Sequence, residues 1–142
     1  MGNLMRDVKL TKVAAGAVSA GTDVTSDILD MSGYDGVVFF ATIATVNAGN
    51  YIKVQQDTDA AGGTMADLTG TKVVGTTNAN TVCVDVYRPQ ERYVRAIIIR
   101  GGTNTVTGDI YALQYRNTRG PLSAQGATID IEYHVSPAEG TA

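Results

Sequence analysis

Few residues in this chain have the chemistry that catalysis requires. His134 is the only histidine, and histidine is the side chain that general acid–base and nucleophilic schemes use most often. It follows Asp130 and Glu132 at alternate positions of a strand-like segment, a pattern that indicates a surface histidine. We therefore expect no catalytic residue and interpret the chain as a non-enzyme.

The single cysteine does not change this interpretation. Cys83 cannot form an intramolecular disulfide, because the chain contains no second cysteine. Its neighbours Val82 and Val84 indicate an inert position within a strand rather than a reactive thiol. Nothing in the spacing connects Cys83 with His134 as a nucleophile and its base.

No metal or cofactor site is indicated either. One histidine and one cysteine would need carboxylates to complete a metal site. The residues Asp57-Thr58-Asp59 resemble the start of a calcium loop, but residues 60–64 supply neither further ligands nor a terminal glutamate. Gly101 and Gly102 follow a strand-like run, but no helix or Lys-Ser/Thr pair follows them to bind phosphate. We expect no metal and no cofactor.

Arginine is the one chemical type that is concentrated in a section of the chain. Residues 88–119 contain six arginines against Glu91 and Asp109, a charge of +4, so the remainder carries −3 − 4 = −7. Arginine makes bidentate contacts to carboxylates and is weakly hydrated, which suits protein interfaces. A solvated sheet face explains the same charges equally well. The candidates for contact with a partner are Arg88, Arg92, Arg116 and Arg119.

Nucleic acid and membranes are poor matches as partners. The arginines and the tyrosines of this section could form a base-stacking platform. The net charge of −3, the pI near 4.9 and the absence of lysine from the section argue against it.

No run approaches about 18 apolar residues, the length that a membrane-spanning helix needs. The first 12 residues contain no apolar stretch of a signal peptide, so we expect a chain made in a cytoplasm.

These arginines belong to a chain with the pattern of a β-protein. Short apolar runs recur between turn residues at the spacing of a sandwich or barrel. Residues 36–46 are apolar at both alternating sets of positions and are expected to form a central strand. Residues 81–100 contain two strand-like runs around a turn at 88–92, and we expect a hairpin there. Alternation makes Arg95 half-buried, where it needs a carboxylate such as Asp85 or Glu91.

The length of 142 residues is that of one domain. We interpret residues 1–33 as an N-terminal arm with the first short strands, 34–121 as the β-sandwich core, and 122–142 as a C-terminal strand and tail. Residues 128–135 alternate between apolar and polar side chains, with Asp130, Glu132 and His134 on the polar face. Such a strand covers a sheet edge or pairs with another subunit.

Several short motifs are spread through residues 34–121. They are the apolar strand after Tyr34-Asp35-Gly36, V-Q-Q-D at 54–57, D-V-Y-R-P at 85–89, R-Y-V-R at 92–95, and Tyr115-Arg116 followed by Arg119-Gly120-Pro121. In this combination the section resembles the capsid cement, or head-decoration, proteins of tailed bacteriophages. The ends of the chain show no such resemblance.

The resemblance implies an all-β fold, a jelly-roll-like β-sandwich with extended N- and C-terminal segments. It also implies a structural virion protein on the outer surface of the capsid, made in the cytoplasm of the bacterial host. The implied partners are the major capsid protein and further copies of the chain, as a dimer or trimer at local symmetry axes. The alternative is a carbohydrate- or receptor-binding β-module of a phage tail or fibre. The absence of tryptophan weighs against that alternative.

Overall fold

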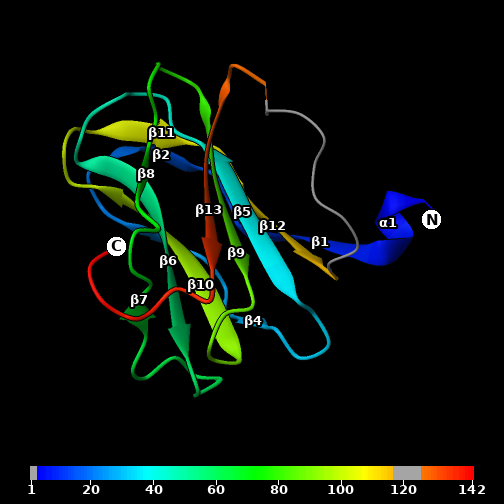
Figure 1. Cartoon of the computed structure of the whole chain (residues 1–142). Coiled ribbons are helices and arrows are strands. Elements are labelled where there is room, and N and C mark those ends of the chain that lie inside the picture. Colours follow the sequence, from blue (N-terminus) through cyan, green and yellow to red (C-terminus); the bar gives the residue numbers. More distant parts are fainter. Residues whose placement is uncertain (1–2, 117–125) are drawn as a thin grey trace.

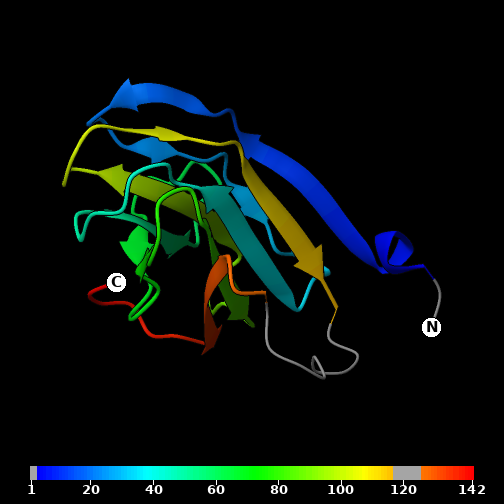
Figure 2. The ribbon, with the colours of Figure 1, turned by 90° about the horizontal axis from the view of Figure 1, so that it is seen from above.

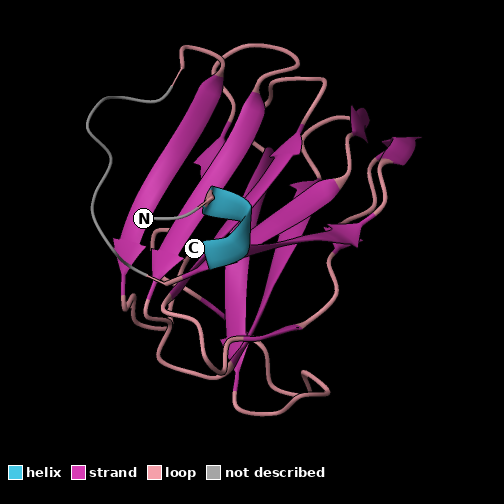
Figure 3. Cartoon of the chain, turned by 90° about the vertical axis from the view of Figure 1, so that its right-hand side faces the viewer, coloured by secondary structure: helices cyan, strands magenta, loops and turns pink. Residues whose placement is uncertain are grey.

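The computed structural model describes residues 3–116 and 126–142, and strands make up almost all of the regular structure (Figure 3). The helix α1 (Leu4–Asp7) is short, and no helix in the described residues is long and apolar enough to span a membrane. The long strands are β1 (Val8–Ala14), β5 (Gly36–Thr42), β6 (Asn50–Asp57), β9 (Thr81–Tyr87), β10 (Tyr93–Arg100), β12 (Ile110–Tyr115) and β13 (Ile129–Val135). The short strands are β2 (Ala17–Ala20), β3 (Val24–Thr25), β4 (Leu29–Asp30), β7 (Ala66–Asp67), β8 (Val73–Val74) and β11 (Thr105–Thr107).

Two main sheets form the body of the molecule (Figures 1 and 2). The five-stranded sheet has the order β1-β12-β5-β9-β13 and is antiparallel except for β13, which runs parallel to β9. The six-stranded sheet has the order β3-β10-β6-β7, with β4 paired to β10 and β8 paired to β6. The strands β2 and β11 form a separate pair.

From β5 to β12, successive long strands lie in alternate sheets. β5, β9 and β12 belong to the five-stranded sheet, whereas β6 and β10, which come between them in the chain, belong to the six-stranded sheet. The chain therefore crosses the gap between the sheets at each of these connections, as it does in jelly-roll-like sandwiches. The predicted all-β, jelly-roll-like β-sandwich is confirmed, and β5 has the predicted central position in its sheet.

The predicted hairpin over residues 81–100 is wrong. β9 pairs with β5 and β13, whereas β10 pairs with β3, β4 and β6, so the two strands lie in opposite sheets. Both strands carry a fully buried apolar residue at every second position, and each needs a facing layer to cover that row. The rows therefore face each other across the core, and residues 88–92 form a crossover between the sheets.

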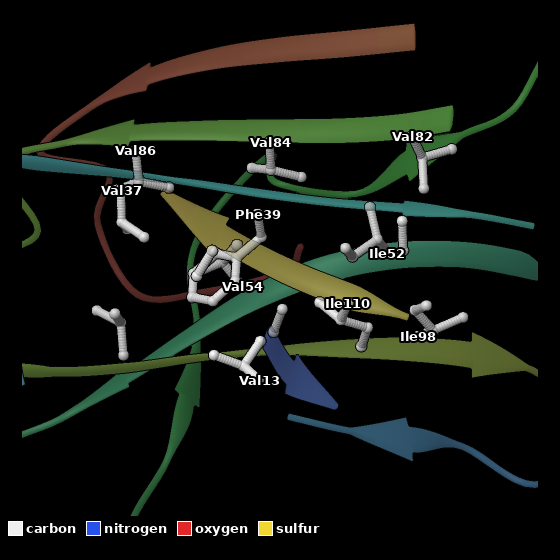
Figure 4. Close-up of a cluster of buried hydrophobic side chains, with 14 of the residues drawn as sticks. Val13, Val37, Phe39, Ile52, Val54, Val82, Val84, Val86, Ile98 and Ile110 are labelled. Carbon is white, nitrogen blue, oxygen red and sulfur yellow. The ribbon is translucent and has the colours of Figure 1, made fainter. Parts of the chain in front are cut away.

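The core lies between these facing rows (Figure 4). One side chain of this size contributes about 1.5–3 kcal/mol when it is fully buried, so the shared core dominates the stability of the sandwich. The five-stranded sheet supplies Val37, Phe39, Val82, Val84 and Val86, and the six-stranded sheet supplies Ile52, Val54, Val94, Ala96 and Ile98.

Residues outside 34–121 also contribute to the core. Val13 of β1 and Leu29 of β4 are buried in it, together with Met31. β1 pairs along its length with β12 and is a member of the five-stranded sheet. Beyond β1, α1 projects away from the body of the molecule (Figures 1 and 2). The N-terminal segment is therefore part of the sandwich, except for α1 at its start.

A buried arginine holds the chain together at the end of β10. Arg100 is 3% exposed. Its Nε donates to the Thr22 carbonyl oxygen at 2.6 Å, and its Nη1 donates to the carbonyl oxygens of Val18 and Thr105 at 2.7 and 2.9 Å. These contacts connect β2, the β2–β3 turn and β11 to β10. Charge-assisted hydrogen bonds to carbonyl groups take the place of a carboxylate partner here.

We expect Arg100→Met to lower the free energy of unfolding by about 3 kcal/mol, because it leaves several buried carbonyl groups without a donor. Urea unfolding followed by circular dichroism measures this loss. Arg95→Met is the matched control, since Arg95 lies on the other face of β10 and is only half-buried. It is expected to cost less than about 1 kcal/mol. Equal losses in the two variants would contradict the assigned role of Arg100.

Candidate functional site: the arginine corner

Three of the four predicted contact arginines lie around one turn, residues 32–35 between β4 and β5. Arg88 and Arg92 border a hollow on one side of this turn. Arg116 borders a second hollow on the other side, together with Arg6 of α1. Arg119 lies outside the described residues. We call the turn 32–35 with Arg6, Arg88, Arg92 and Arg116 the arginine corner.

Strand register explains why these arginines meet. Gly36, the first residue of β5, pairs with Tyr87 at the end of β9 and with Tyr115 at the end of β12. Arg88 and Arg116 directly follow these two tyrosines, so antiparallel pairing places both arginines beside the start of β5. Arg92 comes from the other sheet, where it precedes β10 and lies next to β4.

Two buried glutamines hold the loops of the corner in place. The Oε1 atom of Gln56 accepts hydrogen bonds from the backbone N–H groups of Gln90 and Glu91 at 3.1 and 3.3 Å. The Nε2 atom of Gln114 donates to the carbonyl oxygen of Asp30 at 2.9 Å. Both side chains are buried, and moving either loop would leave buried polar groups unpaired. The arginines therefore extend from a rigid base.

Sequence reasoning did not identify these glutamines as part of the site. Each occupies an inward-facing position of an alternating strand, where an apolar residue is the usual choice. A glutamine in such a position needs buried partners. A glutamine at an inward-facing position was the signal in the sequence for these residues. It could be used only once the inward faces of β6 and β12 were known.

Arg92 is engaged within the corner. Its Nε and Nη2 atoms donate to the two carboxylate oxygens of Asp30 at 2.8 and 2.9 Å, and its guanidinium lies 5.4 Å from the ring centroid of Tyr93. The hydrogen bonds from Arg92 and from the Ser32 backbone lower the pKa of Asp30 to about 2. Both side chains of the ion pair are about half exposed, so a partner can reach the pair but must compete with it.

Arg88 and Arg116 are more available to a partner than Arg92 is. Arg88 packs over the ring of Tyr87, with 5.2 Å to the centroid, and Arg116 donates from Nε to the Gly33 carbonyl oxygen at 3.0 Å. Neither forms an ion pair with a side chain in residues 3–116 or 126–142. Arg88 has a φ of 53°, a left-handed conformation that is uncommon outside glycine. Its backbone N–H donates to the Asp35 carbonyl oxygen, which helps to hold that conformation.

The corner carries charges of both signs. Asp7, Asp30, Asp35 and Glu91 lie among the arginines. Burial raises the pKa of Glu91, and the nearby carboxylates of Glu139 and Asp57 raise it further. A mixed pattern favours one particular partner surface over any polyanion, because each like-charge contact with a wrong partner costs binding energy.

The remaining predicted residues lie elsewhere. Cys83 is buried, and burial raises the pKa of its thiol to about 12. Cys83 pairs with Phe40 and points to the outside of the five-stranded sheet, whereas His134 pairs with Val86, which points into the core. The two residues are thus on opposite faces of the sheet. No group of three potential metal ligands occurs among the residues that the structure describes.

The predicted carboxylate partner of Arg95 is wrong. Arg95 pairs with Gln55 of β6, and its Nε donates to the Gln55 Oε1 atom at 2.8 Å. Asp85 lies in the opposite sheet, where its carboxylate accepts a hydrogen bond from the Tyr115 hydroxyl at 2.5 Å. Burial raises the pKa of Asp85. An amide oxygen is thus sufficient for a half-buried arginine that also reaches solvent.

Comparison with known proteins gives a likeness of fold. The sequence matches no protein-family model and no curated protein. Among solved structures, XepA, an exported protein of PBSX, is similar with a TM-score of 0.57 at 11% identity. The similarity covers 89% of this chain and 43% of XepA, so the chain spans less than half of that protein. At this identity the likeness shows a shared fold and nothing further.

Two carbohydrate-binding structures are similar at lower scores. The CBM22-1 and GH10 modules of xylanase Xyn10B from Clostridium thermocellum, complexed with xylohexaose, have a TM-score of 0.44 at 14% identity, covering 83% of this chain and 26% of that chain. CsCBM6-3 from Clostridium stercorarium, complexed with cellobiose, has a TM-score of 0.38 at 15% identity, covering 78% of this chain and 83% of that chain. Scores this low carry no functional argument.

We expect Arg92→Gln to raise the pKa of Asp30 from about 2 toward its usual 3.8, because the bidentate donor is lost. A lowered carboxyl pKa stabilises the folded state above the unfolded value of 3.8, and this contribution disappears as the pH falls through about 2. Carbon-detected NMR titration of the Asp30 carboxyl group measures the change. Arg88→Gln is the matched control and should leave the titration of Asp30 unchanged.

Proposed function

We propose that this chain is a structural virion protein, a capsid cement protein that binds the outside of the major capsid protein lattice of a tailed phage. The arginine corner is the observation that carries the proposal. It presents Arg88 and Arg116, which form no ion pair within the described chain, and Gln56 holds the crossover that contains Arg88 in place. Such preorganised cations suit an acidic protein surface.

The motifs that carry the family resemblance converge on this corner, which supports the proposal. Residues 34–36 form the end of its central turn and the start of β5, 85–89 and 92–95 flank the crossover that contains Arg88, and Tyr115 precedes Arg116. The motif at 54–57 contains Gln56, which holds that crossover. Segments that are distant in sequence therefore build one surface.

The proposed role in the virion follows from mass action. A protein that binds only the assembled lattice adds its binding free energy to the assembled state and none to the free subunits. Each bound copy would thereby stabilise the DNA-filled head against disassembly. No chemical reaction is needed, and we propose that the chain is not an enzyme.

A carbohydrate- or receptor-binding module is the second candidate. The observation in its favour is the pair of aromatic rings of Phe40 and Tyr111, which stack with centroids 5.7 Å apart on the outside of the five-stranded sheet. Aromatic platforms of this kind can stack against sugar rings. The two charged hollows of the arginine corner have no role in that interpretation, so we rank it below the cement protein.

Purified protein mixed with undecorated, expanded capsids should bind saturably, at an integral number of copies per capsomer. Arg88→Gln/Arg116→Gln should weaken this binding by at least about 100-fold, because each charge-assisted hydrogen bond contributes about 1.5–3 kcal/mol. Lys12→Gln/Lys72→Gln removes the same charge outside the corner and should have little effect. Co-sedimentation with quantitative densitometry measures both variants.

Two results would contradict the cement protein. The first is an absence of saturable binding to expanded capsids. The second is specific retention on a glycan array that Tyr111→Ala abolishes, which would favour the carbohydrate-binding module instead.

A further inference from the structure

The last residues of the chain connect the two main sheets. After β13, which belongs to the five-stranded sheet, residues 136–141 run toward β7 of the six-stranded sheet (Figure 1). Three backbone hydrogen bonds fasten them there. The Thr69 N–H donates to the Ala138 carbonyl oxygen at 2.7 Å, the Gly140 N–H to that of Asp67 at 2.9 Å, and the Gly70 N–H to that of Thr141 at 3.1 Å. We call residues 136–141 the C-terminal strap.

The strap begins at Ser136, which bonds to the crossover on both sides of its arginine. The Ser136 N–H donates to the Tyr87 carbonyl oxygen at 2.8 Å, and the Ser136 hydroxyl donates to the Arg88 carbonyl oxygen at 2.8 Å. The Gln90 Nε2 atom donates in turn to the Ser136 carbonyl oxygen at 3.0 Å. The N–H, the hydroxyl and the carbonyl group of Ser136 are thus all bonded to residues 87–90.

Arg88 and Ser136 both have an unfavourable backbone conformation. Only three non-glycine residues in the described chain have a positive φ, and two of them are Arg88 at 53° and Ser136 at 42°. This left-handed conformation is disfavoured for L-residues. Arg88 also precedes Pro89, and a proline favours extended backbone for the residue before it. Without its hydrogen bonds, Arg88 would therefore leave this conformation, and its side chain would point in another direction.

Two backbone hydrogen bonds hold Arg88 in this conformation. Its N–H donates to the Asp35 carbonyl oxygen at 2.6 Å, and its carbonyl oxygen accepts the bond from the Ser136 hydroxyl. In the conformation that these bonds fix, the guanidinium lies over the ring of Tyr87 and the side chain borders the hollow beside the turn 32–35. Strained residues that their surroundings hold in place cluster at functional sites.

The middle of the strap contributes less to the crossover. Glu139 accepts a hydrogen bond from the Gln56 Nε2 atom at 3.4 Å. Its carboxylate also lies near Glu91, whose pKa is raised by burial and then by the charge of Glu139. Like charges oppose the attachment at this point. Ser136 is therefore the residue through which the strap acts on the crossover.

We propose that Ser136 is a positioning residue for Arg88, and that the C-terminal strap holds Arg88 in the conformation that binds the partner of the arginine corner. This role rests on the proposed function, in which Arg88 contacts an acidic protein surface. The apparent affinity for a partner is reduced by the fraction of molecules outside the binding conformation. The Ser136 hydroxyl keeps that fraction small.

Ser136→Gly separates positioning from stability. Glycine adopts a positive φ without strain, which offsets the lost hydrogen bond, so the melting temperature should stay close to that of the wild-type chain. NMR relaxation of the backbone amides should show increased motion at Arg88 and Gln90, and binding to expanded capsids should weaken about tenfold. Ala138→Gly adds backbone freedom to the same strap without removing a side-chain hydrogen bond. It is the matched control and should change neither measurement.

A double-mutant cycle with Arg88→Gln determines whether the effect passes through Arg88. Ser136→Gly should weaken the binding of the wild-type chain to capsids and have no further effect in the Arg88→Gln chain. Ser136→Asn tolerates a positive φ and keeps a side-chain donor, so it should retain wild-type binding.

Unchanged motion at Arg88 or unchanged capsid binding in Ser136→Gly would overturn the proposal. An equal loss of binding with and without the Arg88 side chain would also overturn it, because Ser136 would then act on the structure in general. The relaxation measurement needs no capsid. If the wild-type chain fails to bind capsids, the proposed function is contradicted, whereas the relaxation data still decide whether Ser136 holds Arg88 in place.

Discussion

The facing apolar rows of β9 and β10 are the constraint on which the remaining structure depends. Each row is fully buried at alternate positions and must be covered by the opposite sheet, so the short segment 88–92 has to cross the gap between the sheets. This crossing brings the ends of β9 and β12, from one sheet, next to the end of β4 and the start of β10 in the other. The arginine corner exists because of that meeting.

Rigidity at the corner comes from polar groups rather than from apolar packing. Gln56 and Gln114 extend from the inward faces of their strands. Gln56 bonds to the backbone of the crossover after Arg88, and Gln114 bonds to the backbone at the end of β4. A crossover loop on the surface would otherwise be among the more mobile parts of a β-sandwich. Because the crossover is fixed from within, Arg88 loses less conformational freedom when a partner binds.

Local patterns were sufficient for the fold class and for most strands, because alternation and turn residues act over a few positions. The central strand β5 and the edge strand β13 were predicted in this way. Partner strands were not predictable, because alternation is the same for a strand that forms a hairpin and for one that crosses to another sheet. That ambiguity produced the incorrect hairpin at 81–100 and the incorrect carboxylate partner for Arg95. The grouping of Arg88, Arg92 and Arg116 likewise depends on register.

The two arginine-centred attachments of the molecule respond differently to acid. The acceptors of Arg100 are backbone carbonyl oxygens, so the connection between β2, β11 and β10 contains no carboxylate that acid could protonate. The attachment between Arg92 and Asp30 depends on an ionised carboxylate. The attachment between Arg92 and Asp30 is therefore lost only when the pH falls through about 2, the pKa of the Asp30 carboxyl group.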